Sequence, residues 1–191
     1  IGEVERAVGH PQRAAEHFRR AETRIDPREF ELRGRLRALQ SELALQEGAS
    51  DEARQHAVEA VRLGREAGAP FTLWHALIAR GMVDRAAGAN AEARAAFAEC
   101  LAIGREFGVP PLLLSPTLYV AILDGDPARG ASALAEWGSR ATMMQRLESA
   151  FALWQVTGDR VHLESARREL ATLRREAPAA ATAADSERVP Q

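Results

Sequence analysis

The side chains best suited to chemistry are five histidines, one cysteine and an acidic turn, and their spacing does not assemble them into a reactive centre. No two histidines share a helix face at i, i+4, and no His-Glu-x-x-His motif occurs. Asp124 and Asp126 flank Gly125 in an Asp-Gly-Asp-Pro turn, where capping of the next helix accounts for an aspartate. No nucleophile elbow is present. We therefore expect no catalytic residue, no metal and no cofactor, and hence no enzymatic activity.

The composition excludes several further classes of site. All 25 basic residues are arginines, so chemistry that needs a lysine amine, including a P-loop or a Schiff base, is excluded. Cys100 is the only cysteine, which rules out an internal disulfide and is typical of a small buried residue. The net charge is −2, and no apolar run reaches the length of a membrane span. We expect a cytoplasmic protein with neither nucleic acid nor membrane as a partner.

A repeat organises the chain. The stretch from Gly48 to Pro70 recurs 40 residues later, from Gly88 to Pro110, and the two copies are identical at 11 of 23 positions. Self-similarity at a period between about 20 and 50 residues is typical of stacked repeat proteins. The chain begins at Ile1 without an initiator methionine, so we expect a fragment of a longer chain whose first hairpin is incomplete.

The hydrophobic pattern predicts helices throughout. Apolar stripes at helical spacing predict helices over 28–47, 51–67 and 71–87, and no segment has the period-2 alternation of a strand. Ser115-Pro116 is predicted to start a shorter helix, and Asp126 is predicted to cap the one after it. Turns between helices are predicted at glycines 9, 48, 88, 125 and 158.

The packing positions of these units resemble the tetratricopeptide repeat. The residues that carry the resemblance are Trp74–Leu77, Gly81, Gly88, Ala93, Phe97 and Cys100, and in the first unit Gly9, Ala14, Phe18 and Ala21. The unit is nearer 40 residues than 34. This long form is similar to MalT-like arrays at the C-terminal end of bacterial signalling ATPases, serine/threonine kinases, adenylate cyclases and LuxR-type regulators. Two expected aromatic positions instead hold Ala57 and Asp84, and the fourth unit is short.

The resemblance implies an all-α fold. Residues 1–176 are expected to form a right-handed α-solenoid of about five antiparallel helix hairpins. Residues 177–191 are rich in alanine and proline and have little to bury, so we expect a disordered tail there.

In such an array the first helix of each hairpin lines a concave groove. The resemblance therefore implies a groove that binds a peptide or a partner helix, with apolar anchors and charges that set its register. The side chains it would present are those of Arg35, Glu42, His75, Met82, Arg85, Tyr119, Gln145, Glu148 and Gln155. Asn90 is the sole asparagine and lysine is absent, so the lysine/asparagine clamp that some family members use for a C-terminal carboxylate is not expected.

The function expected from this reading is a non-enzymatic protein–protein interaction and regulatory scaffold. It would be the C-terminal sensor arm of a bacterial signalling or transcriptional regulator. Its partner would be a protein or peptide, and one candidate is the upstream module of its own chain. Two alternatives stay open: a domain that senses a small-molecule inducer, and a freestanding adaptor that self-associates as a homo-oligomer.

Overall fold

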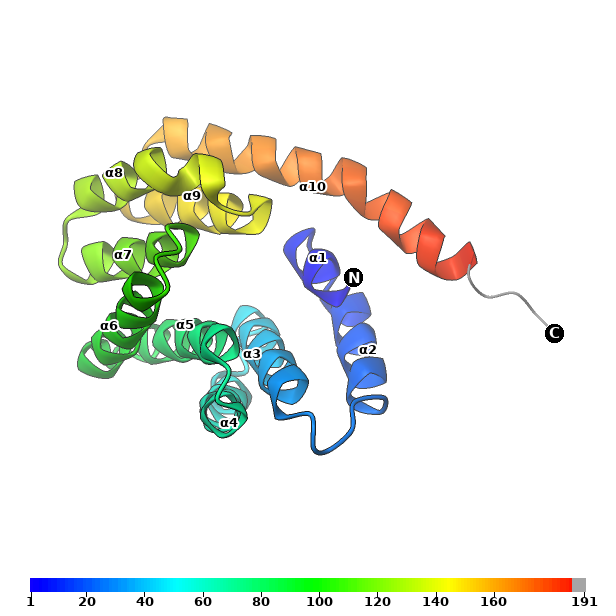
Figure 1. Cartoon of the computed structure of the whole chain (residues 1–191). Helices are drawn as coiled ribbons and strands as arrows, with labels where there is room; N and C mark the ends of the chain where they lie inside the picture. Colours follow the sequence, from blue (N-terminus) through cyan, green and yellow to red (C-terminus); the bar gives the residue numbers. More distant parts are fainter. Residues whose placement is uncertain (187–191) are drawn as a thin grey trace.

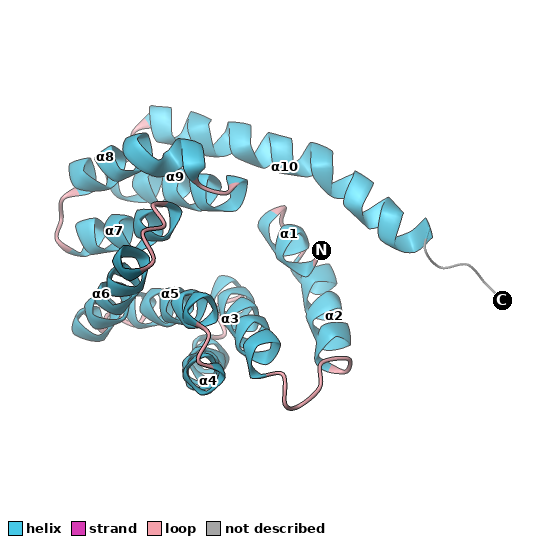
Figure 2. Ribbon diagram, viewed as in Figure 1, coloured by secondary structure: helices cyan, strands magenta, loops and turns pink. Residues whose placement is uncertain are grey.

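In the computed structural model, which describes the backbone of residues 1–186 and the side chains of residues 1–176, every regular element is helical (Figure 2). The all-α prediction is confirmed, and no strand occurs in that part of the chain. The elements are α1 (Gly2–Ala7), α2 (Pro11–Glu22), α3 (Phe30–Gln46), α4 (Ser50–Ala67), α5 (Pro70–Ala86), α6 (Asn90–Glu106), α7 (Pro111–Leu123), α8 (Pro127–Trp137), the 3-10 turn η1 (Gly138–Arg140), α9 (Met143–Thr157) and α10 (Arg160–Ser186).

The helices pack mainly on their neighbours in sequence, and the odd-numbered helices also contact one another. Helix α3 packs on α5 as well as on α4, and α7 packs on α9 as well as on α8. Figure 1 shows the helices arranged around a central space, with α1 facing α9 and α10. Contacts between α1 and α10 join the first and the last helix of the described chain.

The 40-residue repeat is reproduced in the turns. Gly48 and Gly88 have φ of +78° and +76°, a left-handed conformation that side chains disfavour, and a Cβ there would meet nothing within 4 Å. In both turns the residue after the glycine donates its N–H to the carbonyl oxygen five residues back, at 2.9 and 2.8 Å. The backbone conformation, and not packing, therefore requires glycine. The predicted cap is also confirmed, because the Asp126 side chain accepts from the Arg129 N–H at 3.1 Å.

Helix α7 begins earlier than predicted. It starts at Pro111 instead of Ser115, with Pro116 inside its first half. Proline has no N–H to donate to the carbonyl of Leu112, four residues back. The indole N–H of Trp74 in α5 donates to that carbonyl at 3.0 Å. A hydrogen bond from a neighbouring helix thus replaces the one that proline removes, and the helix continues through it.

Close contacts between a glycine and a phenylalanine hold two of the helix pairs. A Cβ added to Gly81 in α5 would lie 2.5 Å from the ring of Phe97 in α6. The same relation recurs in the first pair, where a Cβ on Gly2 would lie 2.7 Å from the ring of Phe18. Each ring occupies the space that a side chain would take, so the two helices approach closely while a large apolar group is buried.

The last helix extends past the predicted boundary at 176. The backbone of α10 is helical to Ser186, inside the segment 177–191 that composition predicts as a disordered tail, and residues 187–191 lie outside the described residues. Within the described chain, none of the helices has both the length and the apolar character needed to span a bilayer.

Replacement of Gly81 by alanine tests the glycine–phenylalanine contact. Alanine in a helix interior usually stabilises relative to glycine by about 0.5–1 kcal/mol. Here we expect Gly81→Ala to destabilise the protein by about 1–3 kcal/mol in urea unfolding, because the Phe97 ring is fully buried and cannot move aside. Phe97→Leu should relieve the clash, so the double variant should lose less stability than the two single losses added together. Additive losses, or a stabilised Gly81→Ala variant, would contradict this account.

Candidate functional site

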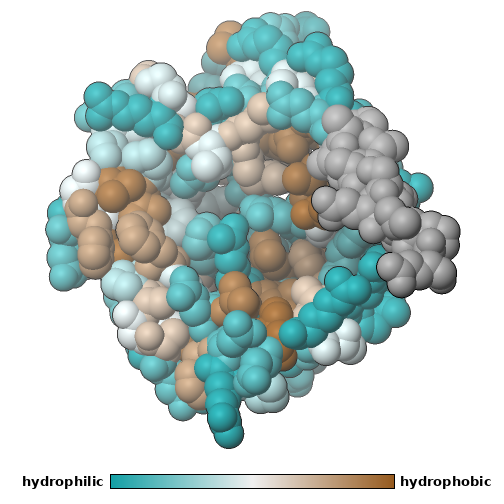
Figure 3. Space-filling view, turned by 45° about the vertical axis from the view of Figure 1, so that its right-hand side comes forward, coloured by the Kyte–Doolittle hydropathy of each residue, from teal (hydrophilic) through white to brown (hydrophobic). Residues whose placement is uncertain are grey.

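A central pocket lies between helices from several parts of the described chain. It is a cavity of about 410 Å³ bordered by α1, α3, α5, α7, α9 and α10. The molecular face in Figure 3 is hollowed near its middle, with apolar and hydrophilic surface around the hollow. This volume lies within the range typical of small-molecule sites. The pocket is thus the candidate functional site.

Six of the nine side chains predicted for the groove line this pocket. They come from α3, α5, α7 and α9 and are Glu42, Met82, Arg85, Tyr119, Glu148 and Gln155. Residues 42 and 82 are one 40-residue period apart, so equivalent positions of the repeat meet at one cavity. The structure therefore brings together most of the predicted set.

Arg35 and His75 do not line the pocket. They lie in the same helices as Glu42 and Met82 but seven residues, about two turns, nearer the N-terminal ends. Burial lowers the pKa of His75, and the charge of Arg35 lowers it further. Periodicity places these residues on helices that border the cavity, but it does not give the position of the cavity along the helix axes.

Gln145 has a structural role instead of a pocket role. Its side chain and that of Thr142 form a capping box at the start of α9, with the Thr142 hydroxyl accepting from the Gln145 N–H at 3.2 Å. Its amide also donates to the carbonyl of Pro111 at 3.2 Å, which ties α9 to α7.

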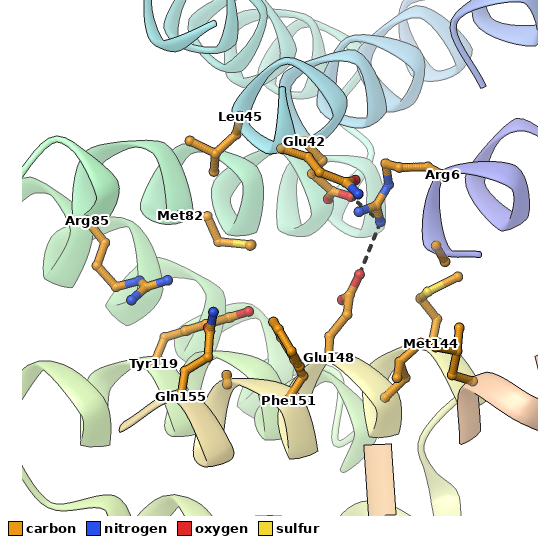
Figure 4. Close-up of a pocket in the computed structure, with 15 residues that line it drawn as sticks. Arg6, Glu42, Leu45, Met82, Arg85, Tyr119, Met144, Glu148, Phe151 and Gln155 are labelled. Atoms are coloured by element: carbon orange, nitrogen blue, oxygen red, sulfur yellow. Dashed lines mark hydrogen bonds and ion pairs between the residues drawn. The ribbon is translucent and has the colours of Figure 1, made fainter. Parts of the chain in front are cut away.

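Arg6 is a pocket residue that the sequence analysis missed. Its Nη2 lies 2.8 Å from a carboxylate oxygen of Glu42 and 3.1 Å from one of Glu148, so one guanidinium bridges α1, α3 and α9 (Figure 4). Arg6 and Glu148 are 142 residues apart in sequence. No local pattern marks a contact between opposite ends of a chain, and only the curvature of the whole array brings these groups together.

The bridge contains two carboxylates and one guanidinium. The Glu42 side chain is 18% exposed, and burial raises its pKa to about 7, with the charge of Arg6 opposing and that of Glu148 adding to the rise. Burial likewise raises the pKa of Glu148, and Arg6 opposes this. Near neutral pH the two carboxylates therefore share one proton part of the time. The net charge of Arg6, Glu42 and Glu148 together is then close to zero.

Arg85 lies at the opposite end of the pocket, with Met82 and Phe151 between it and the bridge (Figure 4). Its guanidinium stands 5.5 Å from the centroid of the Tyr119 ring, a cation–π arrangement. Burial raises the pKa of Tyr119 above its ordinary value, so the phenol stays neutral. The Tyr119 ring in turn stacks on Phe97 at 5.1 Å, so the glycine–phenylalanine contact of the fold positions Arg85 through Tyr119.

Two arginines that line the pocket each have a buried side-chain nitrogen without a hydrogen-bond partner among the described residues. These nitrogens are the Nε atoms of Arg6 and Arg85. A buried polar group without a partner is costly, at about 1–3 kcal/mol. No group of three His, Cys, Asp or Glu side chains in the described part of the chain is placed to hold a metal ion. The arrangement suits the binding of a molecule that brings acceptor atoms into an apolar cavity.

No family model, no curated protein and no solved structure matches the chain.

The Arg6 bridge predicts a stability difference that depends on pH. A glutamate has a pKa of about 4.3 in an unfolded chain. The folded pKa of Glu42 is higher, about 7, so its contribution to stability is full below about pH 4.3 and is lost as the pH rises through 7. Glu42→Gln, which mimics the protonated form, should match the wild type near pH 4 and exceed its unfolding free energy by about 1–3 kcal/mol at pH 8. Urea unfolding at both pH values measures the difference. A variant less stable than wild type at pH 8 would show that the ionised pair stabilises the fold.

Proposed function

We propose that this chain is a non-enzymatic regulatory binding domain of the tetratricopeptide-like type, part of a cytoplasmic bacterial regulator, and that its ligand binds in the central pocket. The observation that carries the proposal is the pocket itself, a cavity of about 410 Å³ bordered by helices from both ends of the chain. The resemblance in packing residues and the repeated turn geometry support the type of array. In this proposal the helices pair into five hairpins of a right-handed solenoid.

The size of the cavity suits a small molecule. Its volume of about 410 Å³ lies within the roughly 300–1,000 Å³ that is typical of small-molecule sites. Of the alternatives that the sequence leaves open, the geometry supports best a domain that senses a small ligand.

Binding in this pocket would act on the contact between the chain ends. Arg6 of α1 holds Glu148 of α9 across the cavity, and Arg174 of α10 donates to the carbonyl of Val8 at 3.5 Å. A ligand that touches α1, α5 and α9 together stabilises the state in which these helices are closed around it. Occupancy of the pocket would therefore bias how the ends of this domain pack, and that bias is the signal a neighbouring module reads.

A protein partner is the second candidate. Phe151 lines the pocket yet is 43% exposed, and Val156, in the next turn of α9, is 46% exposed. An exposed apolar side chain that lines the pocket, such as Phe151, suits contact with a partner segment that inserts one or two side chains into the cavity. In this second candidate function, the pocket is also the site at which the chain binds its protein partner.

Obstruction of the pocket tests the proposal. Gln155 lines the pocket and is exposed, so Gln155→Trp narrows the cavity without disturbing the core, and Gln12→Trp makes the same change at an exposed position of α2. A thermal-shift screen of metabolites and short peptides would be run on the wild type and both variants. A ligand present at ten times its Kd stabilises by about 1.4 kcal/mol, which raises the Tm by about 3–6 °C in a chain of this size.

We expect ligands that raise the Tm of the wild type and of Gln12→Trp but not that of Gln155→Trp. Ligands that stabilise all three proteins equally would place the binding site elsewhere and overturn the proposal.

A further inference from the structure

The pocket places an uncompensated positive charge at one end. No carboxylate of the described residues lies within 4 Å of the Arg85 side-chain nitrogens. Its sequence neighbour Asp84 pairs instead with Arg80, at 2.6 Å. Tyr119 offers Arg85 only its ring face, which leaves the guanidinium without an acceptor. A ligand group that fits this end of the pocket carries negative charge.

The Arg6 bridge at the opposite end of the pocket limits how much negative charge a ligand can carry. Glu42 and Glu148 share Arg6, so the bridge has no guanidinium to spare for a second anionic group. A dianion long enough to cross the pocket would place its second charge against these two carboxylates. The electrostatic pattern therefore favours one negative charge, located at Arg85.

The wall between the two ends is apolar. Leu45 of α3, Met82 of α5 and Phe151 of α9 line the space between Arg85 and the Arg6 bridge (Figure 4). Apolar surface removed from water contributes about 25 cal/mol per Å², so an aliphatic or aromatic body of the ligand gains affinity here. Methionine adapts its shape to such bodies because its side chain is unbranched and flexible.

From these observations we propose that the pocket binds a small monocarboxylate with an apolar body. The carboxylate accepts hydrogen bonds from the terminal Nη atoms of Arg85, in the planar two-point geometry that guanidinium and carboxylate share. The body lies against Met82, Leu45 and Phe151 and points toward the Arg6 bridge. This inference rests on the proposed function, since it names the ligand class for the same pocket.

Hexanoate is the probe that tests the ligand class, with three matched compounds. Hexanamide keeps the shape and removes the charge, hexylammonium reverses the charge, and adipate adds a second carboxylate at the far end. Calorimetric titration of each into the full chain at constant ionic strength gives their affinities. We expect hexanoate to bind at millimolar concentration or below and each of the other three to bind at least about tenfold more weakly, because a charge-assisted hydrogen bond is lost or a repulsion is gained.

Two arginine variants locate the carboxylate. Arg85→Gln should weaken hexanoate binding about tenfold or more, and Arg85→Lys should bind with intermediate affinity because it keeps the charge and loses the planar fork. Arg105→Gln is the matched control, since Arg105 is exposed on α6 and lies outside the pocket, and it should bind hexanoate as the wild type does. If Arg85→Gln does not fold, the comparison of the four compounds on the wild type still decides the question.

The outcomes separate this inference from the proposed function. Equal or tighter binding of hexanamide, hexylammonium or adipate overturns the monocarboxylate class, and so does the absence of hexanoate binding at millimolar concentration. The pocket proposal survives either result if ligands found by the screen still lose binding in Gln155→Trp. Hexanoate that binds Arg85→Gln and wild type equally overturns the assignment of the carboxylate to Arg85.

Discussion

The structure depends on how closely its helices approach one another, and small residues permit that approach. Gly81 leaves room for the Phe97 ring, and Gly64 lets α4 meet the backbone of α5, where a Cβ would lie 2.9 Å from the Cα of Leu73. A chain with only 5% aromatic residues cannot fill wide gaps between helices with large side chains. It therefore gains its packing density from short distances between helix backbones, and each large ring fills a specific gap between two helices.

This constraint extends to the pocket. The Phe97 ring fills the space beside Gly81 and supports Tyr119, and Tyr119 supports Arg85. One repeat earlier the equivalent positions hold Ser41 and Ala57 instead of glycine and phenylalanine, and the Ser41 hydroxyl donates to a backbone carbonyl of α4 at 2.8 Å. Ala57 thus replaces the aromatic residue expected there, and Ser41 replaces the glycine at the position paired with it. The stacked aromatic platform occurs in only one of these two units, and this asymmetry gives the pocket distinct ends.

The charges of the pocket divide into a compensated and an uncompensated end. Arg6 is held between two carboxylates, and its role is to keep α1 closed over the cavity. Arg85 has an aromatic support and no anion. Arg85 is half-buried, so an anionic ligand beside it would gain a charge-assisted hydrogen bond. The proposed ligand completes the site, and its binding would be coupled to closure because the same cavity is bordered by both ends of the domain.

The sequence by itself determined the helical class, the 40-residue period, the turns at Gly48 and Gly88, and six of the residues that line the pocket. These features follow from local periodicity and backbone conformation. The tertiary structure alone decided that Arg6 reaches Glu148 and that Arg35 and His75 lie outside the cavity. It also decided that α7 runs through Pro116 with Trp74 supplying the missing donor. Such contacts join residues far apart in sequence, and the curvature that brings them together is a sum over all helix pairs that no local pattern contains.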